Sequence, residues 1–173
     1  MKKHFETEAI RTQIERTQYN EHSSPLFLTS SFVFDDAEQM QASFAGENDK
    51  NIYSRFSNPN NQELVDKICV MEEAEAGIAF ASGMAAVYTS FAALLKSGDH
   101  IVSARSIFGS THSLFINVFP KWNIETSYFS VDKPEGIEDV IQPNTKLIYA
   151  ETPTNPGVDI LDLAFLGAVA KKH

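Results

Sequence analysis

The chain has 173 residues, long enough for one domain with a hydrophobic core or for part of a larger domain. Hydrophobic residues make up 43% of it and charged residues 21%, a balance typical of soluble globular proteins. The formal net charge of −9 argues against nucleic acid and anionic membranes as partners, because neither surface attracts an acidic protein.

The residues that form disulfides or bind metals are few and scattered. The single cysteine, Cys69, excludes a disulfide framework, and the helical spacing of Leu64, Ile68 and Met71 around it predicts a buried side chain. The five histidines show no ligand spacing, so we expect no metal site. The start, MKKHFETEAI, lacks the apolar run of a signal peptide, and no later run is long enough to span a bilayer. We therefore expect a cytoplasmic protein.

The first third of the chain predicts short, separate elements. Residues 6–18 are typical of a polar amphipathic helix, and residues 25–34 are typical of an extended apolar segment. Residues 35–46 predict a short helix with acidic residues in its first turn and a terminating glycine, Gly46. We interpret residues 1–57 as an N-terminal arm that precedes the main fold.

The rest of the chain predicts alternating strands and helices. The predicted strands are residues 77–82, 100–104, 124–130 and 146–151, and the predicted helices are residues 61–74, 82–96, 109–119, 133–143 and 161–173. This alternation favours an α/β fold with a mainly parallel sheet flanked by helices. Because such a series continues from helix to strand, we interpret residues 58–173 as the first, incomplete part of a domain.

The segment NIYSRFSNPN, residues 51–60, is rich in turn-forming residues and predicts a loop. It carries Tyr53 and Arg55, which together can hold an anion through a guanidinium fork and a hydroxyl donor. Considered alone, the segment favours an ordinary surface loop with a solvated arginine.

Three further loops follow predicted strands and meet at the edge where ligands bind to open α/β sheets. In FASGMAA, Ser82 and Gly83 open a helix whose free N–H groups favour phosphate. In ARSIFGST, Phe108 presents an aromatic ring that can stack on a planar ligand. In ETPTNPG, Asn155 lies between two prolines, which hold its amide stiffly. Each feature alone also fits a common structural role, namely a helix cap, a core phenylalanine and a turn asparagine, but together they predict a flat, phosphorylated aromatic ligand.

The ordered motifs YSRFSNPN, FASGMAA, SIFGST and ETPTNPG resemble the Cys/Met-metabolism branch of pyridoxal-phosphate enzymes, from about residue 7 to the end. This resemblance implies pyridoxal 5′-phosphate as cofactor and the fold type I, or aspartate aminotransferase-like, architecture. It also implies roles for seven residues. Ser82, Gly83 and Met84 would bind the cofactor, the last two through backbone N–H groups on its phosphate; Phe108 would stack on its ring; Asn155 would bond the 3′-oxygen; and Tyr53 and Arg55 would reach the phosphate in a neighbouring subunit. The arm of residues 1–57 would thus reach the neighbouring subunit, the minimal unit would be a homodimer, and the family is usually tetrameric.

Position 108 narrows the expected reaction. Many relatives have tyrosine there, whereas Phe108 can stack but cannot transfer a proton. Phenylalanine in SxFGST, with the following SLF, resembles the O-succinylhomoserine sulfhydrylase subgroup. That resemblance implies γ-replacement of the acyloxy group by sulfide to give homocysteine, as in methionine biosynthesis. Cystathionine γ-synthase and the cystathionine and methionine γ-lyases are alternatives within the family.

Two expectations concern the chain as a whole. None of its ten lysines lies in a context that matches the family's Schiff-base lysine, so we expect that lysine beyond His173 and expect this chain alone to be inactive. Alternatives outside the enzyme class are a short protein that pairs with a full-length homologue and a nucleotide-binding α/β fragment. Against the latter, HIVSARS ends in Arg105 rather than in the acidic residue that a ribose would need.

Overall fold

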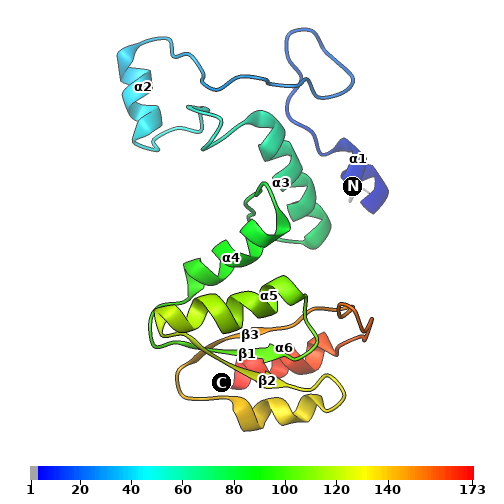
Figure 1. The fold of residues 1–173 in the computed structure, drawn as a ribbon. Coiled ribbons are helices and arrows are strands. Elements are labelled where there is room, and N and C mark those ends of the chain that lie inside the picture. The colour runs from blue at the N-terminus through cyan, green and yellow to red at the C-terminus, as the bar shows by residue number, and fades with distance from the viewer. Residues whose placement is uncertain (1–3) are drawn as a thin grey trace. The chain divides into compact units, whose positions relative to one another are not determined.

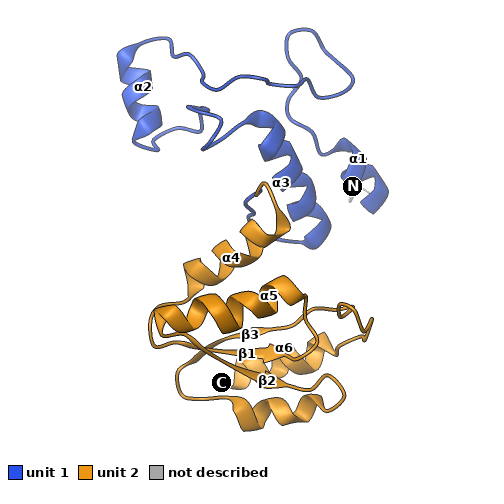
Figure 2. Cartoon of the chain, viewed as in Figure 1, with its two compact units in different colours: residues 1–79 blue, residues 80–173 orange. Residues whose placement is uncertain are grey.

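The computed structural model describes residues 4–173, which form two compact units divided after Ala79 (Figure 2). Unit 1 contains α1 (Phe5–Arg11), α2 (Ala37–Phe44) and α3 (Pro59–Glu72), and unit 2 contains the sheet (Figure 1). The unit boundary lies beyond residue 57, because α3 packs alongside α1. The idea that residues 1–57 reach a neighbouring subunit stays a prediction.

In unit 1, two asparagines tie the start of α3 to the extended segment before α2. The Asn58 side chain caps α3 by accepting from the Asn60 N–H at 2.9 Å. The Asn58 amide also donates to the Phe27 carbonyl at 3.1 Å, and the Asn60 side chain accepts from the Phe27 N–H at 2.8 Å. Proline at the first helical position needs no N–H partner, so α3 begins at Pro59.

The predicted helix over residues 6–18 is wrong beyond Arg11, where α1 ends. The Glu21 carboxylate accepts from the Thr17 N–H at 2.8 Å and from the Thr17 hydroxyl at 2.7 Å. Such local side-chain bonds close a turn and compete with helical hydrogen bonds.

The sheet of unit 2 is parallel, with strand order β2-β1-β3. Its strands are β1 (His100–Ala104), β2 (Glu125–Phe129) and β3 (Thr145–Tyr149), and every residue of the central β1 is buried. The predicted strands 100–104, 124–130 and 146–151 are thus confirmed. They form because short apolar runs between turns suit a covered parallel sheet.

Helices connect these strands across both faces of the sheet (Figure 1). The helix α4 (Gly83–Leu94) leads into β1. The β1–β2 connection is α5 (Gly109–Ser113) continued by the π-helical η1 (Leu114–Val118) and the 3₁₀ helix η2 (Phe119–Trp122); the β2–β3 connection is the 3₁₀ helix η3 (Pro134–Val140), and α6 (Leu163–Lys172) follows β3. Because the chain moves in opposite directions across the sheet in the two connections, right-handed crossovers place α5 on one face and η3 on the other. The helix α6 lies on the same face as η3, since Lys172 and His173 at its end bond to Glu138 of η3.

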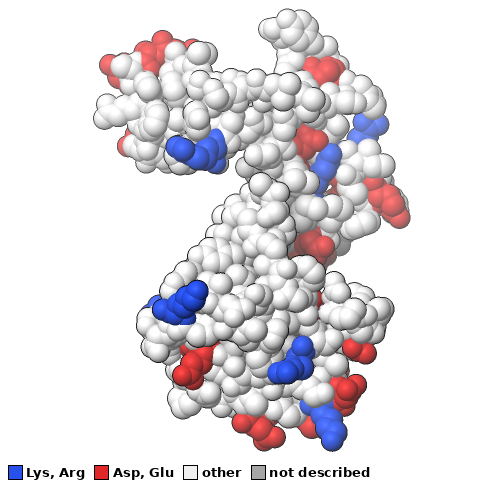
Figure 3. Space-filling view, viewed as in Figure 1, with Lys and Arg blue, Asp and Glu red and all other residues white. Residues whose placement is uncertain are grey.

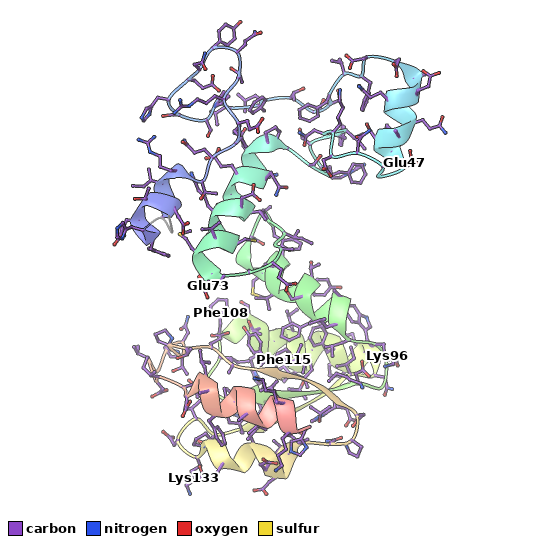
Figure 4. The ribbon with its side chains drawn as sticks, turned by 180° about the vertical axis from the view of Figure 1, so that it is seen from behind. Glu47, Glu73, Lys96, Phe108, Phe115 and Lys133 are labelled. Atoms are coloured by element: carbon purple, nitrogen blue, oxygen red, sulfur yellow. The ribbon has the colours of Figure 1, made fainter. Side chains whose placement is uncertain are left out.

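Aromatic rings fill the core between α4, the helical run from α5 through η2, and the sheet. The Phe91 ring lies 5.1 Å from Phe115, 5.6 Å from Phe119 and 5.2 Å from Tyr149, centroid to centroid. These edge-on and tilted pairs stabilise the packing beyond burial alone, by about 0.5–1.5 kcal/mol each. Figure 4 shows Phe115 inside this layer.

In the face of the molecule drawn in Figure 3, the surface over α4 carries no charged side chain.

Two further sequence predictions are wrong. Residues 77–82 form no strand, and Ile78 is 80% exposed. Within residues 4–173 no strand lies beside this segment to supply ladder hydrogen bonds. The helix predicted over residues 109–119 does not end before Pro120: the helical run continues to Trp122, because Pro120 lies in the first turn of η2, where no N–H is required.

The helices predicted over residues 35–46, 61–74, 82–96 and 161–173 are confirmed as α2, α3, α4 and α6, and residues 133–143 contain η3. None of the helices formed by residues 4–173 is long and apolar enough to cross a membrane.

Candidate active site

The N-terminus of α4 has the features of a phosphate site. The Ser82 hydroxyl caps it by accepting from the Ala85 N–H at 3.1 Å. Gly83 and Met84 occupy the first two helical positions, whose N–H groups have no carbonyl partner within the helix. A Cβ built on Gly83 would meet nothing within 4 Å, so the backbone there is open to an oxygen atom. This geometry fits the phosphate of pyridoxal 5′-phosphate.

Phe108 lies where the loop after β1 enters α5, at the rim of unit 2 (Figure 4). Phe108 is 44% exposed, unlike the buried Phe115 further along the same helical run. A partly exposed ring at the carboxyl end of a central strand is free to stack on a planar ligand. The Phe108 N–H donates to Glu151 Oε2 at 2.9 Å.

Glu151 was not among the residues that the sequence singled out. It follows β3, and its second oxygen, Oε1, accepts from the Tyr149 hydroxyl at 2.9 Å. Burial, and then this hydrogen bond, raise the pKa of Tyr149 to about 12, so the hydroxyl keeps its proton. The sequence gives the position of this glutamate in ETPTNPG, but it does not show that the Phe108 N–H, from the end of another strand, is its second partner.

The loop that carries Asn155 is closed by a pair of side chains. The buried Thr154 hydroxyl donates to Asp159 Oδ2 at 2.8 Å, and the Asp159 N–H donates back to that hydroxyl at 2.9 Å. The Thr154 N–H also donates to the Asp159 carbonyl at 2.9 Å. Asn155 itself is exposed at the tip. The loop is therefore held by more than the prolines that sequence analysis identified.

Tyr53 and Arg55 belong to unit 1. The Arg55 guanidinium carbon lies 5.2 Å from the ring centres of both Tyr53 and Phe56. Among residues 4–173 no carboxylate pairs with Arg55, which leaves its donors for an anion. Both residues line a hollow of about 330 Å³ whose other walls are mostly apolar.

The site residues therefore fall into two groups. The sheet of unit 2 brings Phe108 and the loop of Asn155 together through Glu151, and α4 of the same unit carries the residues from Ser82 to Met84. Their part in binding a cofactor, like that of Tyr53 and Arg55, stays a prediction.

Comparison with known proteins identifies the family. Residues 6–173 match the family described as Cys/Met metabolism PLP-dependent enzyme. The chain belongs to this family. Its cofactor is pyridoxal 5′-phosphate, so the predicted cofactor is confirmed.

Relatives with curated functions include two kinds of family member. The chain is 41% identical to the O-succinylhomoserine sulfhydrylase of Pseudomonas aeruginosa over 96% of its own length. It is 35% identical to the L-methionine gamma-lyase of Porphyromonas gingivalis over 100% of its length. It spans only 41% and 43% of these two proteins, respectively.

Solved structures confirm the predicted fold class. A putative O-acetylhomoserine (thiol)-lyase from Campylobacter jejuni matches 99% of the chain with a TM-score of 0.92 at 32% identity, and the chain covers 42% of it. That structure contains N′-pyridoxyl-lysine-5′-monophosphate. A cystathionine gamma-lyase from Lactobacillus plantarum matches with a TM-score of 0.86 at 32% identity. The fold is therefore that of the Cys/Met-metabolism enzymes, of which the chain represents a part.

Proposed function

We propose that this chain is part of a pyridoxal-phosphate enzyme that converts O-succinylhomoserine and sulfide into homocysteine and succinate. In this reaction the Cγ–O bond breaks, succinate leaves with the bonding electrons, and the sulfide sulfur forms the new bond to Cγ. The protein would act in the cytoplasm, in the biosynthesis of methionine.

The observation that carries the proposal is the exposed Phe108 ring beside the loop of Asn155. An aromatic ring and a side-chain amide at neighbouring strand ends suit a pyridine ring with an oxygen substituent, the first by stacking on its face and the second by bonding its oxygen. Phe108 has no hydroxyl, so proton transfer at the substrate would fall to another group. The relative from Pseudomonas aeruginosa, named O-succinylhomoserine sulfhydrylase, supports the choice of substrate.

The chain's own residues would bind and orient the cofactor, and the cofactor itself would supply the chemistry. Gly83 and Met84 would donate backbone N–H groups to the phosphate, with Ser82 fixing the helix end, and Asn155 would donate to the 3′-oxygen. Bound there, the cofactor withdraws electrons from the amino-acid substrate. Phe108 would exclude water from the face of the cofactor ring on which it stacks.

Tyr53 and Arg55 would bind the cofactor phosphate of a neighbouring copy of the chain. Arg55 suits this role because stacking on Tyr53 and Phe56 orients its guanidinium group and no carboxylate of residues 4–173 competes for it. The working enzyme would then be at least a homodimer, and a tetramer by resemblance to the family.

An assay with alternative substrates tests the proposal. The complete protein, loaded with pyridoxal 5′-phosphate, is expected to form homocysteine from O-succinylhomoserine only when sulfide is present. O-acetylhomoserine should react more slowly. The 173-residue chain alone should form no homocysteine, because the expected lysine is not among its residues. Turnover of O-acetylhomoserine in preference to the succinyl ester would contradict the choice of substrate.

A methionine γ-lyase is the second candidate, because that activity is named for a relative 35% identical over 100% of this chain. Release of methanethiol from methionine, without added sulfide, would identify it. Phe108 argues against this candidate, since a lyase gains from a hydroxyl that can transfer a proton at this position.

A further inference from the structure

Glu151 joins two strand ends that carry proposed cofactor contacts. One oxygen accepts from the backbone N–H of Phe108, and the other accepts from the Tyr149 hydroxyl, each at 2.9 Å. Hydrogen bonds to an ionised carboxylate are about twice as strong as neutral ones. The link is therefore one of the stronger contacts between the loop after β1 and the end of β3.

The position of the Phe108 ring depends on its backbone. A buried ring is held by its neighbours, but Phe108 is 44% exposed and lacks such packing over much of its surface. Its carbonyl accepts from the His112 N–H at 3.0 Å, which ties it to α5, and its N–H is tied to Glu151. Fixing the backbone on both sides of the Cα atom fixes the direction in which the side chain leaves the loop.

Tyr149 anchors Glu151 to the core. The Tyr149 ring lies 5.2 Å from Phe91 and 5.7 Å from Phe115, centroid to centroid, so the hydroxyl is held by packed aromatic rings. The path from the rigid core to the exposed ring thus runs through Tyr149, Glu151 and the Phe108 N–H.

We infer that Glu151 is a positioning residue, whose carboxylate holds the Phe108 ring at the distance and angle at which it stacks on the cofactor. Because Asn155 follows four residues later, the same carboxylate links the contacts proposed for the face of the cofactor ring and for its 3′-oxygen. This inference rests on the proposed cofactor site, and it gives a specific task to a residue that would not itself touch the cofactor.

A double-mutant cycle on the complete protein tests the inference through cofactor affinity. Glu151→Ala is expected to raise the dissociation constant of pyridoxal 5′-phosphate about tenfold, the effect of losing a charge-assisted hydrogen bond. Phe108→Ala should also weaken binding. If Glu151 acts through the ring, the double variant binds no more weakly than Phe108→Ala alone, because coupled residues are not additive.

Additive losses in the cycle would overturn the inference, since Glu151 would then act independently of Phe108. The circular dichroism of the bound cofactor, measured at saturation, gives a second readout: Glu151→Ala should reduce this band, because a mobile ring no longer fixes the cofactor's asymmetric surroundings. An unchanged band would likewise contradict the inference. Absence of cofactor binding by the unmodified protein would instead overturn the proposed function itself.

Conservative and control variants separate positioning from folding. Glu151→Gln keeps an acceptor for the Phe108 N–H and a donor for the Tyr149 oxygen, so it should restore most of the affinity and of the band. Tyr149→Phe, which removes one of the two bonds, should give a smaller loss. Glu138→Gln is the matched control, because Glu138 also has two partners, Lys172 and His173, and should leave both readouts unchanged. No rescue by Glu151→Gln would count against the inference.

Discussion

At the scale of single residues, the most unusual buried side chain is His100, at the start of the central strand. It is fully buried, and its ring nitrogens lie 2.8 Å from the Thr145 hydroxyl of β3 and 3.0 Å from the Ser127 hydroxyl of β2. One side chain therefore joins all three strands. Burial lowers the pKa of His100 below its usual range, and the nearby Glu125 carboxylate opposes this only in part.

This lowered pKa makes stability depend on pH. The folded state binds a proton at His100 less readily than the unfolded state does. The contribution of neutral His100 to the free energy of unfolding is therefore complete above about pH 6.5 and falls as the pH drops toward the folded pKa. We expect urea unfolding to show a loss of stability between pH 7 and pH 5 that His100→Gln abolishes. The exposed His4, replaced in the same way, should leave the pH dependence intact. If the free energy of unfolding of His100→Gln depended on pH as steeply as that of the unmodified protein, His100 would not be the source of the pH dependence.

A matched pair of threonines tests hydrogen bonding. Thr154 exchanges hydrogen bonds with Asp159, whereas the Thr126 hydroxyl is buried without a partner among the residues that the structure describes. Thr154→Val should lower the free energy of unfolding by about 1–3 kcal/mol, because the Asp159 groups lose their partner. Thr126→Val should be neutral or stabilising. Chemical denaturation of both variants checks this, and equal losses would contradict it.

At the scale of elements, α4 depends on Ser82, the residue that caps its start. Ser82→Ala removes the cap and should destabilise the protein by about 1 kcal/mol, measured by thermal unfolding. Ser90→Ala is the control in the same helix, because the Ser90 hydroxyl only returns to the Ala86 carbonyl one turn earlier. That change should cost little or stabilise, since alanine is the better helix former. A larger loss for Ser90→Ala would count against the cap.

Elements whose contacts are local or periodic were predictable from the sequence. The apolar run of β1 and the capped start of α4 needed no knowledge of the rest of the fold. The apolar residues 77–82 look equally like a strand, but a strand requires a neighbour, and a sequence pattern does not show whether one is present. Glu151 was missed for a related reason, because the Phe108 N–H is brought to it only by the pairing of β1 with β3.

At the scale of the whole molecule, residues 72–80, next to the boundary between the two units, form an exposed stretch of the chain. Glu73 has a positive φ of 53°, and Ile78 is 80% exposed in an irregular stretch. Brief digestion with a glutamate-specific protease should cut at Glu73 or Glu75 before it cuts at Glu125, which lies in β2. Mass spectrometry of the first fragments checks this order, and early cleavage inside the sheet would contradict it.

The strand order of unit 2 has a consequence for where any ligand can lie. The strands β1 and β3 are neighbours, but the helices that follow them, α5 and α6, lie on opposite faces of the sheet. The chain segments that leave the two strands therefore diverge. This is a topological switch point, where parallel sheets open a crevice without any help from particular side chains. Glu151 spans that opening from the β3 side to the loop that follows β1. The path of the backbone therefore fixes where in the fold a ligand binds, and substitutions of side chains can change which ligand binds there without changing the position of the site.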